Sequence, residues 1–429
     1  MMRAAFHTLG CKVNQYDTEA MLESFERAGY EIVPFNSDAD VYLINTCTVT
    51  GTGDQKSYKL MRRIAREHPS SGIIAAGCLA QREAEKILAM DNVRLVIGVQ
   101  RRAEVVELYE EACRTGEAIN AVSGLKNASF ESLFVARHEG KTRATMKIQE
   151  GCDRYCSYCI IPYVRGPVRS MHIDAVRAEA KRLADAGYKE IVVTGIHLGS
   201  YGRGEDFTLI DAIRAVHDAG VRVRIGSLEP ITVTEQFARE LSMMPELMRQ
   251  FHLSMQSGSD TVLKRMHRRY DSAEYMRAVE TLRRYMPDCA LTTDVIAGFP
   301  GETDEEHRET LAFVEKVAFA RIHVFPYSRR SGTVADRLPG QVPEELKKIR
   351  TAQLIELGNK LELNFVKSTE NTVQTVLFET EDGVFSEGYT QHYVRVRARA
   401  FPGSISKVLI TCADGKIAVG EPCGPTGGE

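Results

Sequence analysis

Residues 151–159 read Gly-Cys-Asp-Arg-Tyr-Cys-Ser-Tyr-Cys, and this stretch decides the fold. Its cysteines, Cys152, Cys156 and Cys159, have the spacing C-x3-C-x2-C and directly follow a candidate strand at 144–149. In a barrel of alternating strands and helices, the loop after a strand lies at the mouth where active-site loops gather. Three thiolates at this spacing hold three irons of a four-iron cluster and leave the fourth iron open. The stretch therefore predicts a catalytic iron–sulfur site at a barrel mouth.

Two other kinds of metal site would use the same thiols. A structural zinc ion needs a fourth Cys or His nearby. The next histidine, His172, lies thirteen residues after Cys159, beyond Pro162 and Pro167, where we expect it to cap a helix. An electron-carrying ferredoxin normally closes its cluster with a fourth cysteine. The three-cysteine motif therefore favours the open, catalytic cluster.

The sequence around this motif alternates between strands and helices. Expected strands are 144–149, 190–194, 222–227, 250–255, 290–296 and 321–325, and expected helices are 174–186, 209–218, 234–241, 272–285 and 304–317. Six strands separated by helices suit a parallel sheet curved into a partial (β/α)6 barrel. We assign this central domain to residues 138–367, with a charged helix at 343–367 as its last element.

An earlier α/β domain, residues 1–114, supplies a second group of cysteines. Expected strands at 3–8, 40–45, 72–77 and 94–98 alternate with expected helices at 18–28, 54–67, 82–90 and 102–112, which predicts a parallel sheet of βαβ units. Cys11, Cys47 and Cys78 each follow one of the first three strands. Because ligands gather outside the carboxyl ends of parallel strands, we expect the three thiols to converge. The alternative is three unrelated core cysteines, since free Cys is often buried. Residues 115–139 are polar and predict a linker.

The last part, residues 368–429, changes to short alternating strands at 372–379, 384–390, 393–399, 404–411 and 417–420. Five such strands predict a small antiparallel, OB-like β-barrel. Arg395, Arg397 and Arg399 alternate and should share one face of a strand. A second basic face, Lys56, Lys59, Arg63 and Arg66, has helical spacing. Either face is a plausible RNA platform or a solvated surface.

Composition excludes several classes of protein. The chain has 429 residues, 43% hydrophobic and 26% charged, which is ordinary for folded domains. The net charge is −3, so any nucleic-acid partner must bind a local basic patch. No apolar run is long enough to span a bilayer, and the N-terminus lacks a signal-peptide core. The ten cysteines then predict reduced thiols in a cytoplasmic protein rather than a disulfide framework.

The cysteine contexts resemble those of a known family. The string GCDRYCSYCIIPYVRGPVRS at 151–170, with LGCKVNQYDTE, INTCTVT and AAGCLAQ around the first three cysteines, resembles the radical S-adenosylmethionine (SAM) methylthiotransferases. The resemblance implies one 4Fe–4S cluster on Cys152, Cys156 and Cys159 whose open iron binds SAM, and an auxiliary 4Fe–4S cluster on the other three cysteines. It also implies that the C-terminal barrel is a TRAM domain, an RNA-binding module.

Further motifs resemble the same family. They are TGIHLGSYG at 194–202, GSLEP at 226–230, HLSMQSGSD at 252–260, MHRRY at 266–270 and TDVIAGFPGET at 293–303. We expect Gly195 to let the backbone approach SAM, and Glu229, Gln256 and Asp294 to bond its polar edges. Arg269 is expected to pair with its carboxylate. Each of these polar residues has an alternative role as a cap or a barrel-core residue.

Within the family, Leu9–Asn14 (LGCKVN) resembles the branch that acts on N6-threonylcarbamoyladenosine at position 37, beside the tRNA anticodon. The resemblance implies conversion of this nucleoside to its 2-methylthio form with two SAM molecules, in tRNAs that read ANN codons, with external electron and sulfur donors. Alternatives are isopentenyladenosine, a ribosomal-protein aspartate, or a non-catalytic iron–sulfur carrier with an RNA-binding tail. Two residues depart from the family pattern: Glu150 replaces an Asp, and Met171 replaces an Arg.

Overall fold

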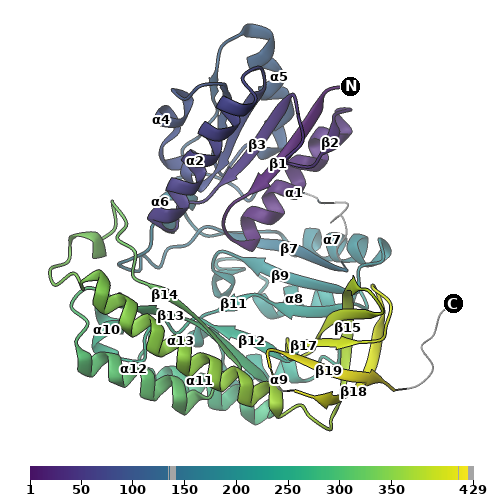
Figure 1. Cartoon of the computed structure of the whole chain (residues 1–429), viewed down its shortest axis with the longest axis vertical. Coiled ribbons are helices and arrows are strands. Elements are labelled where there is room, and N and C mark those ends of the chain that lie inside the picture. The colour runs from purple at the N-terminus through teal and green to yellow at the C-terminus, as the bar shows by residue number, and fades with distance from the viewer. Residues whose placement is uncertain (134, 136–141, 414, 424–429) are drawn as a thin grey trace.

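The computed structural model describes residues 1–133, 135, 142–413 and 415–423 of the chain. An N-terminal sheet domain, a central half-open barrel and a small C-terminal barrel follow one another in the expected order (Figure 1). The proposed domain start at residue 138, the linker end at Glu139 and the terminal segment 424–429 lie outside the described residues. Among the described residues, no helix is long and apolar enough to cross a membrane.

The N-terminal domain is a six-stranded, all-parallel sheet in the order β2-β1-β3-β4-β5-β6. Its strands are β1 (Arg3–Thr8), β2 (Glu31–Val33), β3 (Val41–Thr46), β4 (Gly72–Gly77), β5 (Val93–Ile97) and β6 (Ile119–Asn120). Its helices are α1 (Lys12–Arg27), α2 (Gly51–Glu67), α3 (Cys78–Arg82), α4 (Ala84–Leu88), the 3-10 turn η1 (Arg102–Glu104) and α5 (Val105–Thr115). Helices α1 and α5 cover one face, and α2, α3 and α4 cover the other. β3 and β4 are therefore buried on both faces, which explains their continuous apolar sequence.

The structure differs from the expected elements at three places in this domain. Helix α1 begins at Lys12 rather than 18, because its first turns bury the polar residues Asn14 and Asp17 and so hide the apolar period. The helix expected at 82–90 is the short pair α3 and α4. The segment expected to be a linker is partly structural, since it supplies β6 and buries Leu133 and Val135 against Tyr16.

The central domain is the predicted partial barrel. Its strands are β7 (Arg143–Glu150), β8 (Arg169–Ser170), β9 (Glu190–Gly195), β10 (Arg222–Ile225), β11 (Ser227–Leu228), β12 (Gln250–Leu253), β13 (Ala290–Ala297) and β14 (Arg321–Pro326). They form two sheets, β10-β9-β7-β8 and β11-β12-β13-β14, and only Gly226 separates β10 from β11. The curved wall is therefore continuous from β8 to β14 and is open between its two ends.

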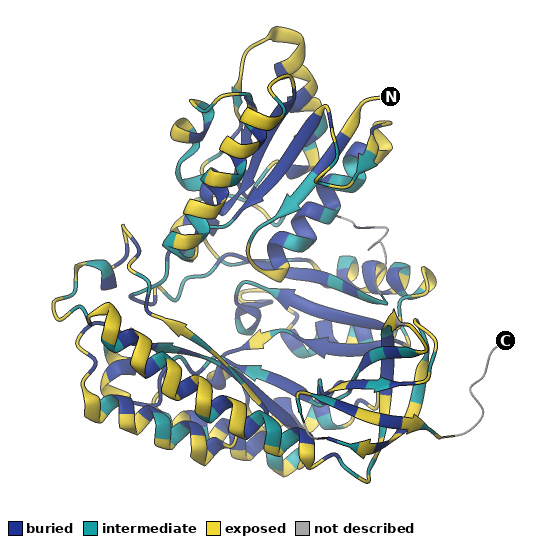
Figure 2. Cartoon of the chain, viewed as in Figure 1, coloured by how far each residue is buried: buried dark blue, intermediate teal, exposed yellow. Residues whose placement is uncertain are grey.

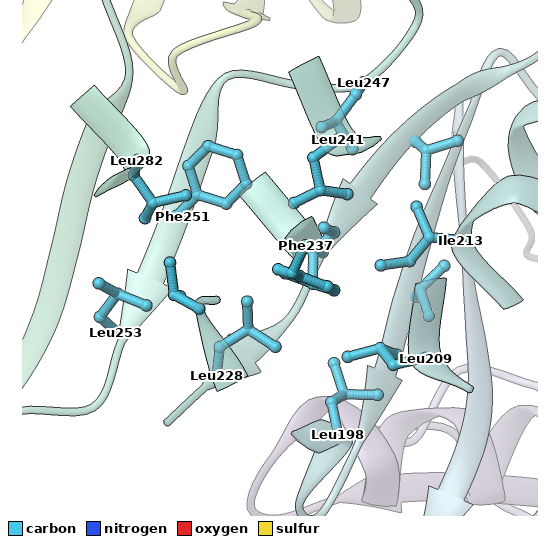
Figure 3. Packing of buried hydrophobic residues seen from close by; sticks show 14 of the residues in the cluster. Leu198, Leu209, Ile213, Leu228, Phe237, Leu241, Leu247, Phe251, Leu253 and Leu282 are labelled. Atoms are coloured by element: carbon cyan, nitrogen blue, oxygen red, sulfur yellow. The ribbon is translucent and has the colours of Figure 1, made fainter. Parts of the chain in front are cut away.

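Helices cover the outside of this wall (Figure 1). They are α7 (Ile173–Asp185), α8 (Leu209–His217), α9 (Glu235–Ser242), α10 (Asp260–Arg265), α11 (Ser272–Tyr285), α12 (Asp304–Val317) and α13 (Glu344–Lys367), with 3-10 turns η2 (Leu198–Ser200), η3 (Pro230–Thr232) and η4 (Ala335–Arg337). The short helix α6 (Ile161–Arg165) instead packs against the N-terminal domain, beside Cys78 and Val99. Side chains from these helices and the strands, among them Leu209, Phe237, Phe251 and Leu282, interlock in one large core (Figure 3). This core makes the barrel a rigid support for its mouth loops.

The C-terminal domain is a closed five-stranded barrel in the order β15-β16-β17-β19-β18. Its strands are β15 (Val373–Asp382), β16 (Phe385–Thr390), β17 (Arg395–Ala398), β18 (Ile405–Cys412) and β19 (Ile417–Pro422). The pair β17–β19 is parallel, so the barrel differs in one pair from a wholly antiparallel one. Along the C-terminal strands, residues that are buried inside the barrel alternate with exposed ones, as the change of colour along these ribbons shows in Figure 2.

Polar contacts hold the three domains together. Arg143, at the start of β7, donates from Nη2 to Glu379 Oε2 on β15 at 2.8 Å. Tyr16 on α1 donates to the carbonyl of Leu133, and Lys147 on β7 contacts Asp17 on α1 at 2.5 Å. The N-terminal domain and the small barrel therefore both contact the sheet near its first strand, at the open side of the central barrel.

Candidate active site

The first three cysteines lie at the carboxyl ends of three neighbouring strands of the N-terminal sheet. Cys11 is the N-cap of α1 after β1, Cys47 follows β3, and Cys78 begins α3 after β4. These three strands are neighbours in the sheet. Burial raises the pKa of Cys78 to about 12, and the nearby Cys11 and Cys47 thiols contribute to the rise. The structure thus brings the three thiols into one electrostatic neighbourhood.

Two asparagines order the loops that carry these thiols. Asn14 donates from Nδ2 to the carbonyls of Leu9 and Thr46 at 2.8 and 3.0 Å, which ties the loop after β1 to the loop after β3. Asn45 donates to the carbonyl of Asn14 at 2.9 Å. Gly77 precedes Cys78 with φ +91°, and a Cβ there would lie 2.2 Å from Asn45 Oδ1. A glycine is therefore required where the chain turns to place Cys78.

A buried arginine from the central domain contacts this thiol group. Arg165 ends α6, is 1% exposed, and donates from Nε to Cys78 Sγ at 3.2 Å. Its Nη1 donates to Glu150 Oε1 at 2.6 Å, and its Nη2 donates to Asn14 Oδ1. The guanidinium therefore joins the first cysteine group to the end of β7, directly before the second cysteine group.

Arg165 belongs to a buried ionic network between the two domains. Its other members are Asp17, Arg102, Glu131, Lys147 and Glu150, so three cations face three carboxylates. Although burial opposes ionisation, Arg165, Lys147 and Arg102 hold the pKa of Glu150 well below its usual value. The change of Asp to Glu at this position keeps the charge that the network needs. The other departure, Met171, is 1% exposed and packs in the barrel core.

The second cysteine group occupies the loop after β7. Gly151 has φ +74°, and a Cβ there would lie 1.9 Å from the Pro167 carbonyl oxygen, so the loop turns where only glycine fits. The Cys152 amide donates to the Gly166 carbonyl at 3.0 Å, and the Cys159 amide to the Cys156 carbonyl at 2.9 Å. Burial raises the pKa of Cys152 to about 11 and of Cys159 to about 12, and Cys156 raises both further.

This group also has a buried arginine partner. Arg268 donates from Nη1 to Cys156 Sγ at 3.1 Å, and its Nη2 lies 2.9 Å from Glu229 Oε1. Glu229 Oε2 lies 2.8 Å from Arg154 Nε and 2.7 Å from His197 Nε2. Burial opposes ionisation of Glu229, but the His197 hydrogen bond and the charges of Arg268, His197 and Arg154 lower its pKa to about 2. Glu229 is thus an ionised hub that orients three side chains beside the cysteine loop.

The remaining residues expected to bind SAM are placed as follows. Gly195 ends β9, and a Cβ there would lie 2.8 Å from Gln149 Cβ. The Gln256 amide donates to the Asp294 carbonyl at 2.9 Å, and Asp294 Oδ2 lies 3.5 Å from His252 Nε2. Arg269 is exposed, whereas its neighbour faces Cys156. These positions leave the SAM roles as predictions.

Sequence reasoning missed Arg154, Arg165, His197 and Arg268. The MHRRY motif contains two adjacent arginines, and the segment turns through His267 at φ +59°, so periodicity does not tell which one points inward. His197 lies in the TGIHLGSYG motif at 194–202, so this motif could have identified it as a candidate site residue. The other two arginines lie inside the cysteine string but would each be read as surface charge without the fold.

A cavity of about 580 Å³ connects the two domains. It reaches from Cys11 and Val49 in the N-terminal domain to Gly195 and His252 on the barrel strands, and Tyr393 of the small barrel also lines it. It is large enough for a nucleoside-sized ligand, because such pockets commonly measure about 300–1,000 Å³. Residues of all three domains thus border this cavity.

The donor atoms fit iron–sulfur clusters better than a mononuclear metal. Each site gathers three thiols, which are the usual ligands of such clusters. Among the described residues, no group of three His, Cys, Asp or Glu side chains is placed to hold a single metal ion. Each site also has a buried arginine that donates to one of its sulfurs. Two separate clusters with three protein ligands each are therefore compatible with the geometry.

The fold and site define a class of protein. Residues 146–314 match the radical SAM superfamily, and residues 3–98 match the family described as uncharacterized protein family UPF0004. A solved radical SAM methyltransferase from Kitasatospora setae, TsrM, superposes with TM-score 0.57 over 89% of this chain and 82% of its own, at 12% identity. This likeness concerns the fold. The protein is a radical SAM enzyme, a class that uses a 4Fe–4S cluster and SAM.

Curated relatives narrow the class. The threonylcarbamoyladenosine tRNA methylthiotransferase MtaB of Bacillus subtilis is 41% identical over 95% of this chain and 93% of its own length. The protein of the same name from Thermotoga maritima is 36% identical over 92% and 91%. A tRNA-2-methylthio-N(6)-dimethylallyladenosine synthase from Oceanobacillus iheyensis is 34% identical over 94% and 80%. The chain belongs to the radical SAM methylthiotransferase family.

Proposed function

We propose that this enzyme transfers a methylthio group to C2 of N6-threonylcarbamoyladenosine at position 37 of tRNAs that read ANN codons. The observation that carries the proposal is the cavity that reaches from Cys11 to Gly195 and His252 on the barrel strands, because a nucleoside bound there would lie between the first cysteine group and the barrel that carries the second. The choice of nucleoside is supported by the names of four similar proteins at 32–41% identity. Proteins named for dimethylallyladenosine are 34–35% identical, so that nucleoside is the main alternative.

We assign the ligands of the two clusters to the two cysteine groups. Cys152, Cys156 and Cys159 would hold the cluster that binds SAM, and Cys11, Cys47 and Cys78 would hold the auxiliary cluster. When bound, the two clusters and SAM would together supply the electron, the hydrogen-abstracting radical and the methylthio sulfur. Gly195, Glu229, Gln256, Arg269 and Asp294 remain candidates for SAM contacts, and we add Arg268, because it already contacts Cys156.

The protein's own residues would bind, orient and shield the reacting base. A nucleoside bound in the cavity would displace water from its walls, and exclusion of water protects a radical reaction from side reactions. The base must leave its stack to enter, as single-stranded RNA loops allow. No side-chain acid or base is needed for hydrogen abstraction at carbon, so the polar groups serve recognition and support.

The tRNA would contact more than the cavity. The arginine face of β17, formed by Arg395, Arg397 and Arg399, and the exposed basic face of α2 are candidate backbone contacts. We place the functional domains at 1–114, 138–367 and 368–429, the last as the RNA-binding TRAM module. A reducing electron donor and a sulfur donor are required as separate partners. We expect the reaction in the cytoplasm, where thiols stay reduced.

Nucleoside mass spectrometry tests the function directly. tRNA from a strain lacking the gene should accumulate N6-threonylcarbamoyladenosine and lack its 2-methylthio form, and the gene should restore it. Loss of methylthio-isopentenyladenosine instead would assign the alternative nucleoside. Unchanged tRNA with loss of a methylthiolated ribosomal-protein aspartate would assign the protein substrate. Failure of reduced enzyme to produce 5′-deoxyadenosine from SAM would favour a non-catalytic carrier.

A further inference from the structure

The cavity beside Cys11 is lined by basic residues and by no acid. Three of its lining residues are Lys or Arg, two are His, and none is Asp or Glu; the five basic ones are Lys12, Arg224, His252, Arg321 and His323. A concave surface with charge of one sign concentrates ligands of the opposite sign. The lining therefore selects an anionic ligand over a neutral or cationic one.

Lys12 is the cation of this lining that no carboxylate neutralises. It is the first residue of α1 and directly follows Cys11. Among the described residues, no hydrogen bond or ion pair of its ammonium group occurs, and the first turn of α1 contains no acidic residue. A cation at the positive end of a helix is unfavourable. Lys12 is exposed to solvent and lines the cavity, so its ammonium group is accessible to a ligand there.

The acids near the cavity are already paired. Glu190 lies 2.7 Å from Arg224 Nε and 3.4 Å from Arg222 Nε, and Glu379 pairs with Arg143. Each of these carboxylates is therefore matched by at least one guanidinium, which leaves the Lys12 charge in excess.

The surroundings of Tyr393 contain the same excess of positive charge. The guanidinium carbon of Arg224 lies 4.6 Å from its ring centre, and that of Arg143 lies 5.4 Å from it. Burial raises the pKa of a phenol, but here the charges of Arg143, Lys12 and Arg224 outweigh burial and lower the pKa of Tyr393. The half-buried Tyr393 side chain therefore lies beside two guanidinium groups, in a part of the cavity where positive charge predominates.

We propose that this cavity recognises the carboxylate of the threonyl group on the substrate nucleoside, with Lys12 as the residue that pairs with it. The inference rests on the proposed function, because the threonylcarbamoyl substituent carries a carboxylate and the dimethylallyl substituent carries no charge. Because Lys12 directly follows Cys11, pairing at this position also holds the nucleoside beside the first cysteine group. Lys12 is thus a specificity-determining residue that distinguishes the two nucleosides.

A double comparison of protein and RNA tests the assignment. The reconstituted enzyme is titrated under anaerobic conditions with a fluorescent anticodon stem–loop that carries either threonylcarbamoyladenosine or its carboxylate methyl ester. Wild type should bind the free acid at least tenfold more tightly than the ester, a difference of about 1.4 kcal/mol, because the ester removes a hydrogen bond to a charged group. Lys12→Gln should lose this discrimination, and Lys12→Arg should retain it. The exposed Lys316→Gln on α12 is the matched control and should behave as wild type.

The alternatives give different results. If Lys12→Gln weakens binding of the acid and of the ester equally, the anion is an RNA phosphate and the proposal is wrong. If Lys12→Gln loses iron or alters the cluster signal in electron paramagnetic resonance (EPR), Lys12 serves the cluster and the proposal is also wrong. If wild type discriminates acid from ester but forms no methylthio product from the acid, the proposed function fails while the carboxylate site stands. If wild type does not discriminate, the site itself is refuted.

Discussion

Arg165 Nε lies 3.2 Å from Cys78 Sγ, although the two residues belong to different domains. Arg165 lies six residues after Cys159 on the same segment of chain. One short segment therefore carries Cys159 of the second cysteine group and the hydrogen-bond donor to a thiol of the first cysteine group. Arg165 on α6 therefore links the segment of the second cysteine group to a thiol of the first.

Replacement of Arg165 should change the auxiliary cluster and leave the SAM-binding cluster unchanged. Hydrogen bonds to a cluster sulfur stabilise the reduced state and raise its potential. Arg165→Lys keeps the charge that Glu150 needs but removes the planar fork. We expect the potential of the auxiliary cluster to fall by roughly 60 mV, the equivalent of a tenfold change for one electron, as measured by EPR during redox titration.

Arg169→Lys provides the control for this experiment. Arg169 is also buried and lies four residues further along, but it donates to the backbone carbonyls of Arg165 and Pro167. Its replacement should leave both potentials unchanged. Equal shifts in Arg165→Lys and Arg169→Lys would mean that the effect comes from a general disturbance of the segment.

Most of the fold was predictable because its signals are local. The strands of the first domain and of the barrel are short apolar runs between helices, and their predicted bounds agree with the structure within a few residues. The exceptions are β2, β6 and β8, which are edge strands of two or three residues. Such strands are held by their neighbour in the sheet rather than by an apolar pattern of their own.

The candidate site divides in the same way. Cys11, Cys47 and Cys78 could be grouped from sequence because parallel topology places successive strand ends together. The partners Arg165 and Arg268 could not, because each acts across a distance that only the tertiary structure closes. In the sequence, an arginine that donates to a cysteine sulfur looks the same as an arginine on a surface loop. Only its burial in the folded structure distinguishes the first from the second.

Removal of either cysteine group should remove half of the iron. If each group holds one cluster, reconstituted wild type should contain about eight irons per chain. Cys11, Cys47 and Cys78 replaced together by Ala should leave about four, and the SAM-binding cluster should keep its EPR signal. Cys113, Cys289 and Cys423 replaced together form the control and should keep all eight. An unchanged iron content in the first variant would refute the auxiliary assignment.

Gly195→Ala should loosen the loop of the second cysteine group. The added Cβ would lie 2.8 Å from Gln149 Cβ and 3.1 Å from the Gln149 carbonyl oxygen. Gln149 donates to the Gly151 carbonyl at 2.8 Å and accepts from the His197 amide at 2.6 Å, so its displacement disturbs both sides of the loop. We expect a loss of about 1–3 kcal/mol in unfolding free energy, as overpacking costs, together with weaker SAM binding.

Gly124→Ala is the matched control, because nothing lies within 4 Å of its added Cβ. Unfolding in urea measures the stability, and equilibrium dialysis measures SAM binding. If Gly195→Ala equals the control in both, the close approach at Gly195 has no functional consequence.

The ionised state of Glu229 should make stability depend on pH. Its pKa is about 2 in the folded protein against 4.5 as the ordinary value. The stabilisation is therefore complete above about pH 4.5 and is lost as the pH falls towards 2, and it amounts to about 3 kcal/mol. Glu229→Gln should be destabilised at pH 7, and its difference from wild type should shrink below pH 4.5.

Urea unfolding of the iron-free chain at pH 7, 5 and 3 measures this difference. Glu305→Gln removes an exposed ion pair with Arg308 and should cost less than about 1 kcal/mol at every pH. A difference between wild type and Glu229→Gln that stays constant down to pH 3 would contradict the low pKa.

The arginine face of β17 should contribute to RNA affinity through charge alone. Arg395 and Arg399 are exposed, and the Arg397 and Arg399 guanidinium carbons lie 4.9 and 5.9 Å from the Phe385 ring centre, which supports their orientation. Each phosphate contact adds about 0.7 to the salt dependence of single-stranded binding. Replacement of all three arginines by Gln should therefore lower affinity and reduce the slope of log K against log salt by up to about 2. Replacement of the exposed Arg177, Lys181 and Lys316 removes the same charge elsewhere and should leave the slope unchanged.

Because phosphate contacts do not read the base, the variant that lacks all three β17 arginines should bind modified and unmodified stem–loops with equally reduced affinity. A loss confined to the modified stem–loop would instead place this face in nucleoside recognition.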